Sequence, residues 1–572
     1  MEYLIFIGAI FAYVVICYIY GIHNTKKEQM LFKEKVKEQY GSYPTKQYTL
    51  EQYDRISHYS EYKQMRDSAT THNRCDEITW NDLEMEELFQ AMNHTYSSAG
   101  EEYLYEMLHN LVTDIEVLEG RRKRINQYQQ EETLRIQLLS VYKELGTTGK
   151  FSIVDYLDYL GSVSKTNNNS SYGMIVLLLT SIFFIFFDGL IGSMLTIGMI
   201  CIQMGRYFKR KREIEPYFTS VGYLLRLIKA GRIISTMEVP ILQKEQEKIK
   251  QLLSYLKGFT RNTTFICGGG TALSNNSLNV VSDYINMLFH FDLIQFNGVL
   301  TIVEQEKERI LQLLELVGSI EAEIAIAYYR AWLPYYCEPV FYTQSHMVQE
   351  ELYMPLIPNA VSNTIDTNKS ILLTGSNASG KSTFLRSVAI NGILAQTIVT
   401  CSAQKVQMPF MHIYSSIAIR DNLKKQDSYY LAEIKSIKRI LDVADTNKLP
   451  VLCFIDEVLR GTNTIERIAA STQILKLLIQ KNVMCFAATH DIELTQLLKN
   501  LYDNYHFQEE IHGDDISFDY LIQQGAATSR NAIFLLKTLG YDSQIIEQSM
   551  EMANRFLEKG VWEIANYTNM IP

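Results

Sequence analysis

The hydrophobic pattern of the chain begins with a long apolar run near its N-terminus. Tyr3–Tyr20 carries no charged side chain, and a helix needs about 20 predominantly apolar residues to cross a bilayer. No basic flank precedes the run and no small-residue cleavage site follows it, as a removed signal peptide would require. Lysines follow at positions 26, 27, 33, 35 and 37. Because basic residues favour the cytoplasmic side, the pattern predicts a membrane anchor over residues 1–22 whose C-terminal side is cytoplasmic.

A second apolar stretch extends from about Tyr172 to Phe208. It is too long for one straight crossing of a hydrocarbon core about 30 Å thick. Asp188-Gly189 interrupts it near the middle, and a carboxylate at the bilayer centre would cost several kcal/mol. The pattern therefore predicts two crossings joined by a turn over residues 171–208, and basic residues at 209–212 place its end in the cytoplasm. A helical hairpin buried in a soluble core is the alternative.

The stretches around this hairpin, 23–170 and 209–345, show helical spacing of apolar residues. Within the second stretch, apolar side chains recur at the i, i+3, i+4 and i+7 positions of one helical face: Ile310, Leu313, Leu314 and Val317. We therefore expect an all-α core and lever region in two parts, divided by the membrane hairpin.

The pattern changes at about residue 346, where short β-rich runs alternate with helical runs. Three of the β-rich runs are Ser370–Leu373, Val451–Ile455 and Val483–Ala487. Strands that alternate with helices are typical of an α/β fold with a mainly parallel sheet. The sequence thus predicts an α/β domain over 346–572.

The amino-acid composition excludes some classes of protein but does not identify the function. The 572 residues are 47% hydrophobic and 21% charged, which excludes a wholly disordered protein. A net charge of −10 gives no global basic field for nucleic acid, although a local basic patch would be averaged away. The eight cysteines form no Cys-x-x-Cys pair, so neither a zinc site nor a disulfide framework is indicated.

A phosphate-binding loop follows the first of these β-rich runs and precedes a helical run. The motif comprises Gly375, Ser376, Asn377, Ala378, Ser379, Gly380, Lys381 and Ser382, and Thr383 follows it. Its glycines let backbone N–H groups surround phosphates, and the following helix directs its positive end at them. We expect Lys381 to neutralise the β- and γ-phosphates of ATP and Ser382 to bind Mg²⁺. A glycine-rich turn without a ligand is the alternative.

Two further β-rich runs end in residues suited to nucleotide hydrolysis. Asp456 follows one and is assigned to Mg²⁺, and the adjacent Glu457 is placed to orient or deprotonate the attacking water. An acidic pair that caps the next helix is the alternative. His490 follows the other run, where it would sense or polarise the γ-phosphate. We therefore predict Glu457, His490 and Lys381 as catalytic, and Ser382 with Asp456 as metal ligands.

Taken together, these motifs resemble the ATPase of the MutS family of DNA mismatch-repair proteins. The segments that carry the resemblance are Thr374–Arg386, Asp456–Thr464, Ala487–His490, and Arg420–Leu423 with Asp427–Glu433. The resemblance implies a P-loop NTPase fold, ATP with Mg²⁺, and a homodimer with composite sites. It implies that Ser428 completes the partner's ATP site, where an exposed helix N-cap is the alternative. It also implies that Ile357 packs on adenine.

The departures from the family pattern shape the functional hypothesis. A mismatch sensor of this family begins with a domain that inserts an aromatic residue into DNA, whereas here a predicted membrane anchor stands in that place. We therefore expect a membrane-anchored, dimeric, ATP-driven switch at the cell membrane, with about three transmembrane helices and a cytoplasmic ATPase domain. DNA or a membrane-proximal partner is its expected target. The alternatives are a true mismatch-binding protein, the ATPase of a membrane transporter, and an ATP-gated scaffold without hydrolysis.

Overall fold

A computed structural model describes most of the chain. It covers residues 20, 23–24, 26–46, 48–66, 73–163, 167–261, 278–376, 379–417, 429–446, 449–512, 515–527, 533, 536 and 540–562. The chain divides into two compact units that are interleaved in sequence. The first comprises 1–71, 89–109 and 115–332, and the second comprises 72–88, 110–114 and 333–572.

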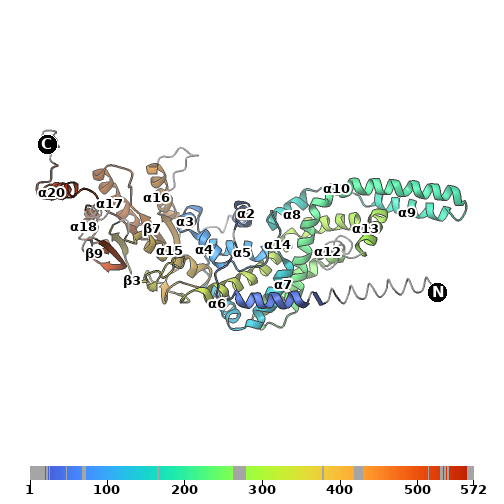
Figure 1. Ribbon diagram of the computed structural model, residues 1–572, viewed down its shortest axis with the longest axis horizontal. Coiled ribbons are helices and arrows are strands. Elements are labelled where there is room, and N and C mark those ends of the chain that lie inside the picture. Colours follow the sequence, from blue (N-terminus) through green and yellow to red (C-terminus); the bar gives the residue numbers. More distant parts are fainter. Residues whose placement is uncertain are drawn as a thin grey trace. The chain divides into compact units, whose positions relative to one another are not determined.

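The first unit is built from helices (Figure 1). They are α2 (Leu50–Arg66), α5 (Ser98–His109), α6 (Ile115–Gln130), α7 (Glu132–Leu145), α8 (Ile153–Ser162), α9 (Asn169–Phe184), α10 (Gly189–Thr236), η2 (Pro240–Leu242), α11 (Gln243–Tyr255), α12 (Lys257–Arg261), α13 (Leu278–Phe289) and α14 (Phe291–Trp332). The division between the units falls within α4 (Met85–Met92).

The long helix α14 lies at the centre of this unit, because α5, α6, α8, α10 and α11 all pack on it. The four apolar residues predicted to share one helical face, Ile310, Leu313, Leu314 and Val317, are all buried in α14. Near its middle, Glu306 leaves the helical conformation, with φ −114° and ψ 15°, and marks a kink.

The second predicted membrane stretch forms a helical hairpin. Helix α9 packs along α10, and the chain turns at 185–188 (Figure 1). Asp188 caps α10, since its side chain accepts hydrogen bonds from the backbone N–H groups of Leu190 and Ile191. The predicted turn at Asp188-Gly189 is thus confirmed. Helix α10 continues to Thr236, so the apolar stretch that was predicted to end at 208 and the helical region predicted after it form one helix.

Only part of the predicted membrane content is visible in the described ranges. There, one helix, α10, is long and apolar enough to cross a membrane, and α9 is a shorter apolar helix. The predicted anchor at 1–22 lies almost wholly outside the described residues. The membrane crossings therefore remain predictions.

The second unit contains two sheets. One has six strands in the order β10-β9-β4-β8-β7-β6, parallel throughout except for the antiparallel pair β9/β10. Its strands are β4 (Ser370–Thr374), β6 (His412–Ser416), β7 (Val451–Asp456), β8 (Val483–Ala488), β9 (Tyr502–His512) and β10 (Asp515–Gln524). The three predicted β-rich runs are confirmed as β4, β7 and β8. They are adjacent in the sheet in the order β4-β8-β7, so their carboxyl ends lie along one edge.

A smaller sheet and several helices complete this unit. The sheet runs in the order β1-β5-β2-β3, with β1 (Val340–Phe341), β2 (Met347–Leu352), β3 (Asn363–Thr367) and β5 (Lys405–Met408). The helices are α3 (Glu77–Asp82), α15 (Lys381–Thr397), α16 (Tyr429–Thr446), α17 (Thr464–Gln480), α18 (Ile492–Leu497) and α20 (Ser543–Lys559). Side chains of β7 and β8 form a core cluster with α16 and α17, which includes Ile437, Cys453 and Leu475.

The sheet edge at β6 is covered by a segment from far upstream. Helix α3 packs on β6. Asp82 accepts hydrogen bonds from Ser415 Oγ at 2.7 Å and from the backbone N–H of Ile417 at 2.8 Å, and Thr79 Oγ1 accepts one from the N–H of Ser415 at 3.1 Å. Residues 73–88 therefore belong to the α/β fold even though nearly 250 residues of chain separate them from it.

Candidate nucleotide site

The two glycines that bound the loop between β4 and α15 both have positive φ angles. Gly375 has φ +144° and Gly380, which precedes α15, has φ +101°, both disfavoured for other residues. A Cβ at Gly375 would lie 2.8 Å from Ser379 Oγ and 3.0 Å from the carbonyl oxygen of Phe507. The glycines are therefore required by both backbone conformation and space. Asn377 and Ala378 lie outside the described residues.

The interior of this loop offers polar groups to a ligand. Ser376 Oγ is buried, and no described residue forms a hydrogen bond with it. Lys381 is 3% exposed, and its ammonium donates to the carbonyl oxygens of Gly375 at 2.8 Å and Ser376 at 2.6 Å. Burial lowers the pKa of Lys381, while the nearby carboxylate of Asp456 raises it. A buried cation and an unsatisfied hydroxyl beside a helix N-terminus fit a bound phosphate group.

A carboxylate and a hydroxyl meet where Mg²⁺ was predicted. Ser382 Oγ, in the first turn of α15, donates a hydrogen bond to Asp456 Oδ2 at the end of β7. Burial raises the pKa of Asp456, and the adjacent Glu457 raises it further. In the described ranges no cluster of three or more His, Cys, Asp or Glu side chains could hold a metal by itself. Ser382 and Asp456 fit Mg²⁺ nonetheless, since that ion keeps several waters and takes few protein ligands beside the substrate's phosphates.

The predicted catalytic carboxylate is held by two basic side chains. Glu457 Oε1 lies 2.9 Å from His490 Nε2, and Glu457 Oε2 lies 2.8 Å from Arg460 Nε. The hydrogen bond with His490 is the main cause that lowers the pKa of Glu457, and Arg460 contributes to the same effect. Glu457 is therefore ionised at neutral pH, as a group that accepts a proton from water must be.

The segment after Asp456 is conformationally strained. Glu457 has φ +59° and Leu459 has φ +60°, a region that costs a non-glycine residue roughly 1–2 kcal/mol. Leu459 is 3% exposed and joins the core cluster under the sheet. Its burial offsets the strain, and the turn aims Glu457 across the carboxyl ends of β7 and β8. The backbone N–H of Glu457 donates to the carbonyl oxygen of Ala488 at 3.0 Å.

The structure thus brings together five of the predicted residues from three strand ends: Lys381, Ser382, Asp456, Glu457 and His490. Thr383 follows Ser382 in α15. Ile357 lies in the connection between β2 and β3 with 45% of its surface exposed, and its contact with adenine stays a prediction. Ser428 lies outside the described residues, immediately before α16.

Sequence reasoning gave no role to two residues that contact this site. Arg460 was noticed only as part of the segment after Asp456, and Glu433 only as the end of the segment that contains Ser428. The signal for Arg460 was its position three residues after Glu457. Glu433 gave no such signal, because it accepts a hydrogen bond from the backbone N–H of Leu459, which lies in the turn after β7 and not in its own helix.

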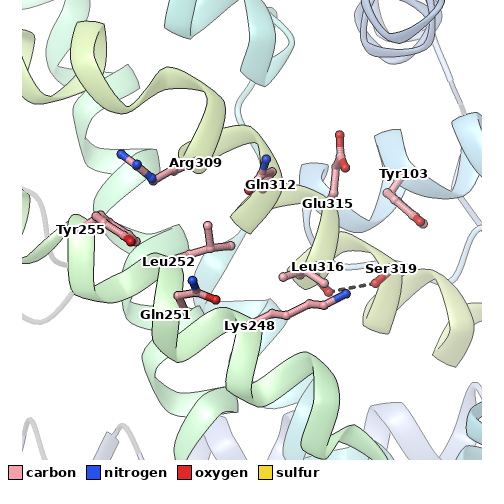
Figure 2. Close-up of a pocket in the computed structure, with 10 residues that line it drawn as sticks. All are labelled: Tyr103, Lys248, Gln251, Leu252, Tyr255, Arg309, Gln312, Glu315, Leu316 and Ser319. Carbon is pink, nitrogen blue, oxygen red and sulfur yellow. Dashed lines mark hydrogen bonds between the residues drawn. The ribbon is translucent and has the colours of Figure 1, made fainter. Parts of the chain in front are cut away.

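A separate cleft lies wholly in the helical unit, between α11 and α14 with Tyr103 of α5 at one end (Figure 2). Its volume is about 590 Å³. The residues that line it carry charges of both signs: Lys248, Arg309 and Glu315. Arg309 lies over the ring of Tyr255 at 3.9 Å, and Glu315 pairs with Lys63 at 2.7 Å. These contacts join neighbouring helices, and the cleft shares no residue with the phosphate loop.

Strand order, loop conformation and the Ser382–Asp456 contact define a P-loop nucleotide-binding protein. Comparison with known proteins narrows the class. Residues 371–557 match the family model of MutS domain V. The DNA mismatch repair protein MutS of Thermotoga maritima is 31% identical over 271 residues, which cover 46% of this chain and 33% of that protein. The protein of the same name from Natronomonas pharaonis is 28% identical over 271 residues, 45% of this chain and 31% of that protein.

The C-terminal half of this chain carries a domain that matches MutS domain V, and the similarity to the MutS proteins lies in that half. It spans about a third of the length of the curated relatives that it matches.

Proposed function

We propose that this protein is a membrane-tethered MutS-type ATPase that works as a dimeric, ATP-driven switch. The observation that carries the proposal is the arrangement of Lys381, Ser382, Asp456, Glu457 and His490 around one phosphate loop. The match to MutS domain V supports it, since MutS proteins are ATPases that generally act as dimers on DNA.

The side chains suggest how hydrolysis would proceed. Lys381 and the loop N–H groups hold the phosphates, and Mg²⁺ held by Ser382 and Asp456 would neutralise their charge. Glu457 accepts the proton of the water whose oxygen attacks the γ-phosphorus, and ADP is the leaving group. His490 holds the Glu457 carboxylate toward that water. Loss of the γ-phosphate would remove the ligand that joins the two halves of a composite site.

The test compares the full-length protein, reconstituted in liposomes, with the Glu457→Gln variant. ATP hydrolysis that depends on Mg²⁺ and falls by about 10²-fold or more in Glu457→Gln supports the proposal. An ATP-binding wild type without turnover under any condition would instead favour an ATP-gated scaffold. Rates measured without DNA and with duplex, mismatched and branched DNA identify the target.

The hairpin of α9 and α10 supports the membrane part of the proposal. Large apolar side chains on it are exposed, among them Phe186 at 84%, Phe187 at 73% and Leu190 at 73%. Monomeric soluble proteins rarely expose continuous apolar surface of this kind, whereas lipid would cover it. In contrast to the buried hairpin of a soluble core, only 17% of the most apolar window of α10 is buried. Retention in the membrane fraction after alkaline carbonate extraction is expected, and release would contradict membrane insertion.

Composite sites can be tested by mixing two inactive variants. Lys381→Ala destroys a protomer's own loop, and Ser428→Ala would remove the group that it gives to its partner. A mixed dimer then keeps one intact site, so random mixing should restore about a quarter of wild-type activity. Activity that stays absent after mixing would argue against a serine acting across the dimer.

A mismatch-binding function is the second candidate, because the relatives named above are called DNA mismatch repair proteins. The detergent-solubilised full-length protein would then bind a mismatched duplex more tightly than a matched one. Equal or absent binding in band-shift titrations would exclude this candidate.

A further inference from the structure

A buried carboxylate on α16 contacts the strained turn that carries Glu457. Glu433 is 2% exposed, and its Oε1 accepts a hydrogen bond from the backbone N–H of Leu459. The N–H of Arg460 also stabilises the ionised form of this carboxylate. The carboxylate therefore caps two consecutive N–H groups of the turn.

Helix packing reinforces this contact. Tyr430, in the first turn of α16, packs directly against Gly461. A Cβ at Gly461 would approach Tyr430 Cβ to 2.9 Å, closer than side chains approach in folded proteins. The first turn of α16 is thus fitted to the turn at 457–461 by shape as well as by hydrogen bonds.

The turn also contacts the catalytic carboxylate of Glu457 directly. Arg460, whose N–H faces Glu433, directs its side chain to Glu457 Oε2 at 2.8 Å. Glu457 in turn contacts His490. A continuous set of contacts therefore runs from α16 through Leu459 and Arg460 to Glu457. Because α16 begins at Tyr429, the set starts next to Ser428 in the sequence.

Burial of Glu433 is costly, which argues that the contact is specific. Its second oxygen, Oε2, is buried and has no hydrogen-bond partner among the residues that the structure describes. Burial raises the pKa of Glu433 to about 7, although the N–H groups of Leu459 and Arg460 oppose this. An apolar residue would fill the position at lower cost, but it would leave the two N–H groups of the turn unsatisfied.

We propose that Glu433 is a positioning residue for hydrolysis: it holds the turn at Leu459–Arg460 in the conformation that presents Glu457 to the attacking water. The inference rests on the proposed ATPase function.

The test uses the full-length reconstituted protein with Glu433→Ala and Glu433→Gln. Asp442→Ala is the matched control, because Asp442 is an exposed carboxylate on the same helix and pairs with Lys438 one helical turn away. We expect kcat to fall about 10- to 100-fold in Glu433→Ala, with the dissociation constant of a fluorescent ATP analogue changed less than about threefold. Glu433→Gln should lose less, because its amide oxygen still accepts one N–H group. Asp442→Ala should behave as the wild type.

Amide hydrogen exchange separates failure of this inference from failure of the proposed function. Peptides that cover 456–463 should exchange faster in both Glu433 variants than in the wild type, whereas peptides from α15 should not change. Wild-type kcat or unchanged exchange at 456–463 in Glu433→Ala would overturn the inference. If the alanine variant misfolds, Glu433→Gln decides by the same two readouts. A wild type without turnover refutes the ATPase proposal, while the exchange result still decides whether Glu433 holds the turn.

Discussion

Glu457 and His490 are joined by a 2.9 Å contact between Oε1 and Nε2, although 33 residues separate them in the sequence. The contact exists because β7 and β8 are parallel neighbours whose carboxyl ends meet. It gives His490 a role in orienting Glu457, since the hydrogen bond also lowers the pKa of the carboxylate.

Replacement of His490 should therefore impair turnover more than binding. We expect His490→Ala to lower kcat about 10- to 100-fold while the affinity for ATP changes little, because the phosphate loop is intact. Steady-state kinetics and equilibrium binding of a fluorescent ATP analogue measure the two quantities. Equal losses in kcat and affinity would place His490 in ground-state binding instead.

Arg460 should control the pH dependence of hydrolysis. Its positive charge helps to keep the pKa of Glu457 below the ordinary value. Activity that requires ionised Glu457 falls as pH drops through that pKa, so Arg460→Ala, which raises the pKa, should move the acidic limb to higher pH. Profiles of kcat against pH for the wild type and Arg460→Ala measure the shift, and Arg439→Ala on α16 is a control for loss of an arginine. A shift to lower pH would contradict this assignment.

At Leu459, a glycine substitution should destabilise the protein no more than an alanine substitution, the reverse of the usual order. Both changes lose the burial of a leucine side chain, at roughly 2–5 kcal/mol. Glycine relieves the strain of φ +60°, worth roughly 1–2 kcal/mol, which exceeds its extra chain entropy of roughly 0.5–1 kcal/mol. Thermal melting should therefore find Leu459→Gly at least as stable as Leu459→Ala. A glycine variant that is clearly less stable would show that the positive φ is not retained in solution.

The hairpin turn should be accessible from the side of the membrane opposite the ATPase. Gly189 has open space around its Cα, so Gly189→Cys is structurally tolerated. In intact cells a membrane-impermeant maleimide should label this cysteine, whereas a cysteine that replaces Arg210 should react only after the membrane is opened. Labelling of both positions, or of neither, in intact cells would contradict two crossings.

Buried Glu321 should make the helical unit less stable as pH rises. Burial raises its pKa from the ordinary 4.5 to about 7, partly opposed by the hydroxyl of Ser97 and the backbone N–H of Tyr96. The folded state therefore binds more protons than the unfolded state between these values, and the unfolding free energy falls across that window by an amount on the order of 3 kcal/mol. Melting temperatures from pH 5 to 8 should fall less steeply in Glu321→Gln than in the wild type. The exposed carboxylate of Glu144 provides the control variant, Glu144→Gln, with an unchanged slope.

Local patterns predicted the parts of this protein that depend on neighbouring residues. Alternating β-rich and helical runs marked β4, β7 and β8, and the glycines of the phosphate loop marked the turn before Lys381. Asp188-Gly189 marked the hairpin turn because a carboxylate is costly inside a bilayer. The same single residue, Asp188, is the N-cap of α10. The predicted helical region after 208 joins the hairpin without a break, since α10 keeps its helical conformation through charged residues and through Pro216.

Features that depend on distant segments were not predicted. The spacing of apolar residues at 73–88 says only that a short helix is present there. Its role at the β6 edge depends on Asp82 meeting Ser415, more than 300 residues later. Glu433 was missed for the same reason, because its partner N–H groups lie in a turn 26 residues away. The positive φ of Leu459 was also missed, because leucine has no preference for that conformation.

The cover that α3 provides for β6 bears on any attempt to isolate the ATPase. A fragment that begins at Leu333 would contain both sheets and the phosphate loop, but not the groups of Thr79 and Asp82 that satisfy Ser415 and Ile417. Its outermost strand would then present bare N–H groups, which invite pairing with another copy of the fragment. If such a fragment associated in solution, the cause would be the edge strand that truncation uncovers. Its association would therefore not be evidence for the ATP-dependent dimerisation of the intact protein.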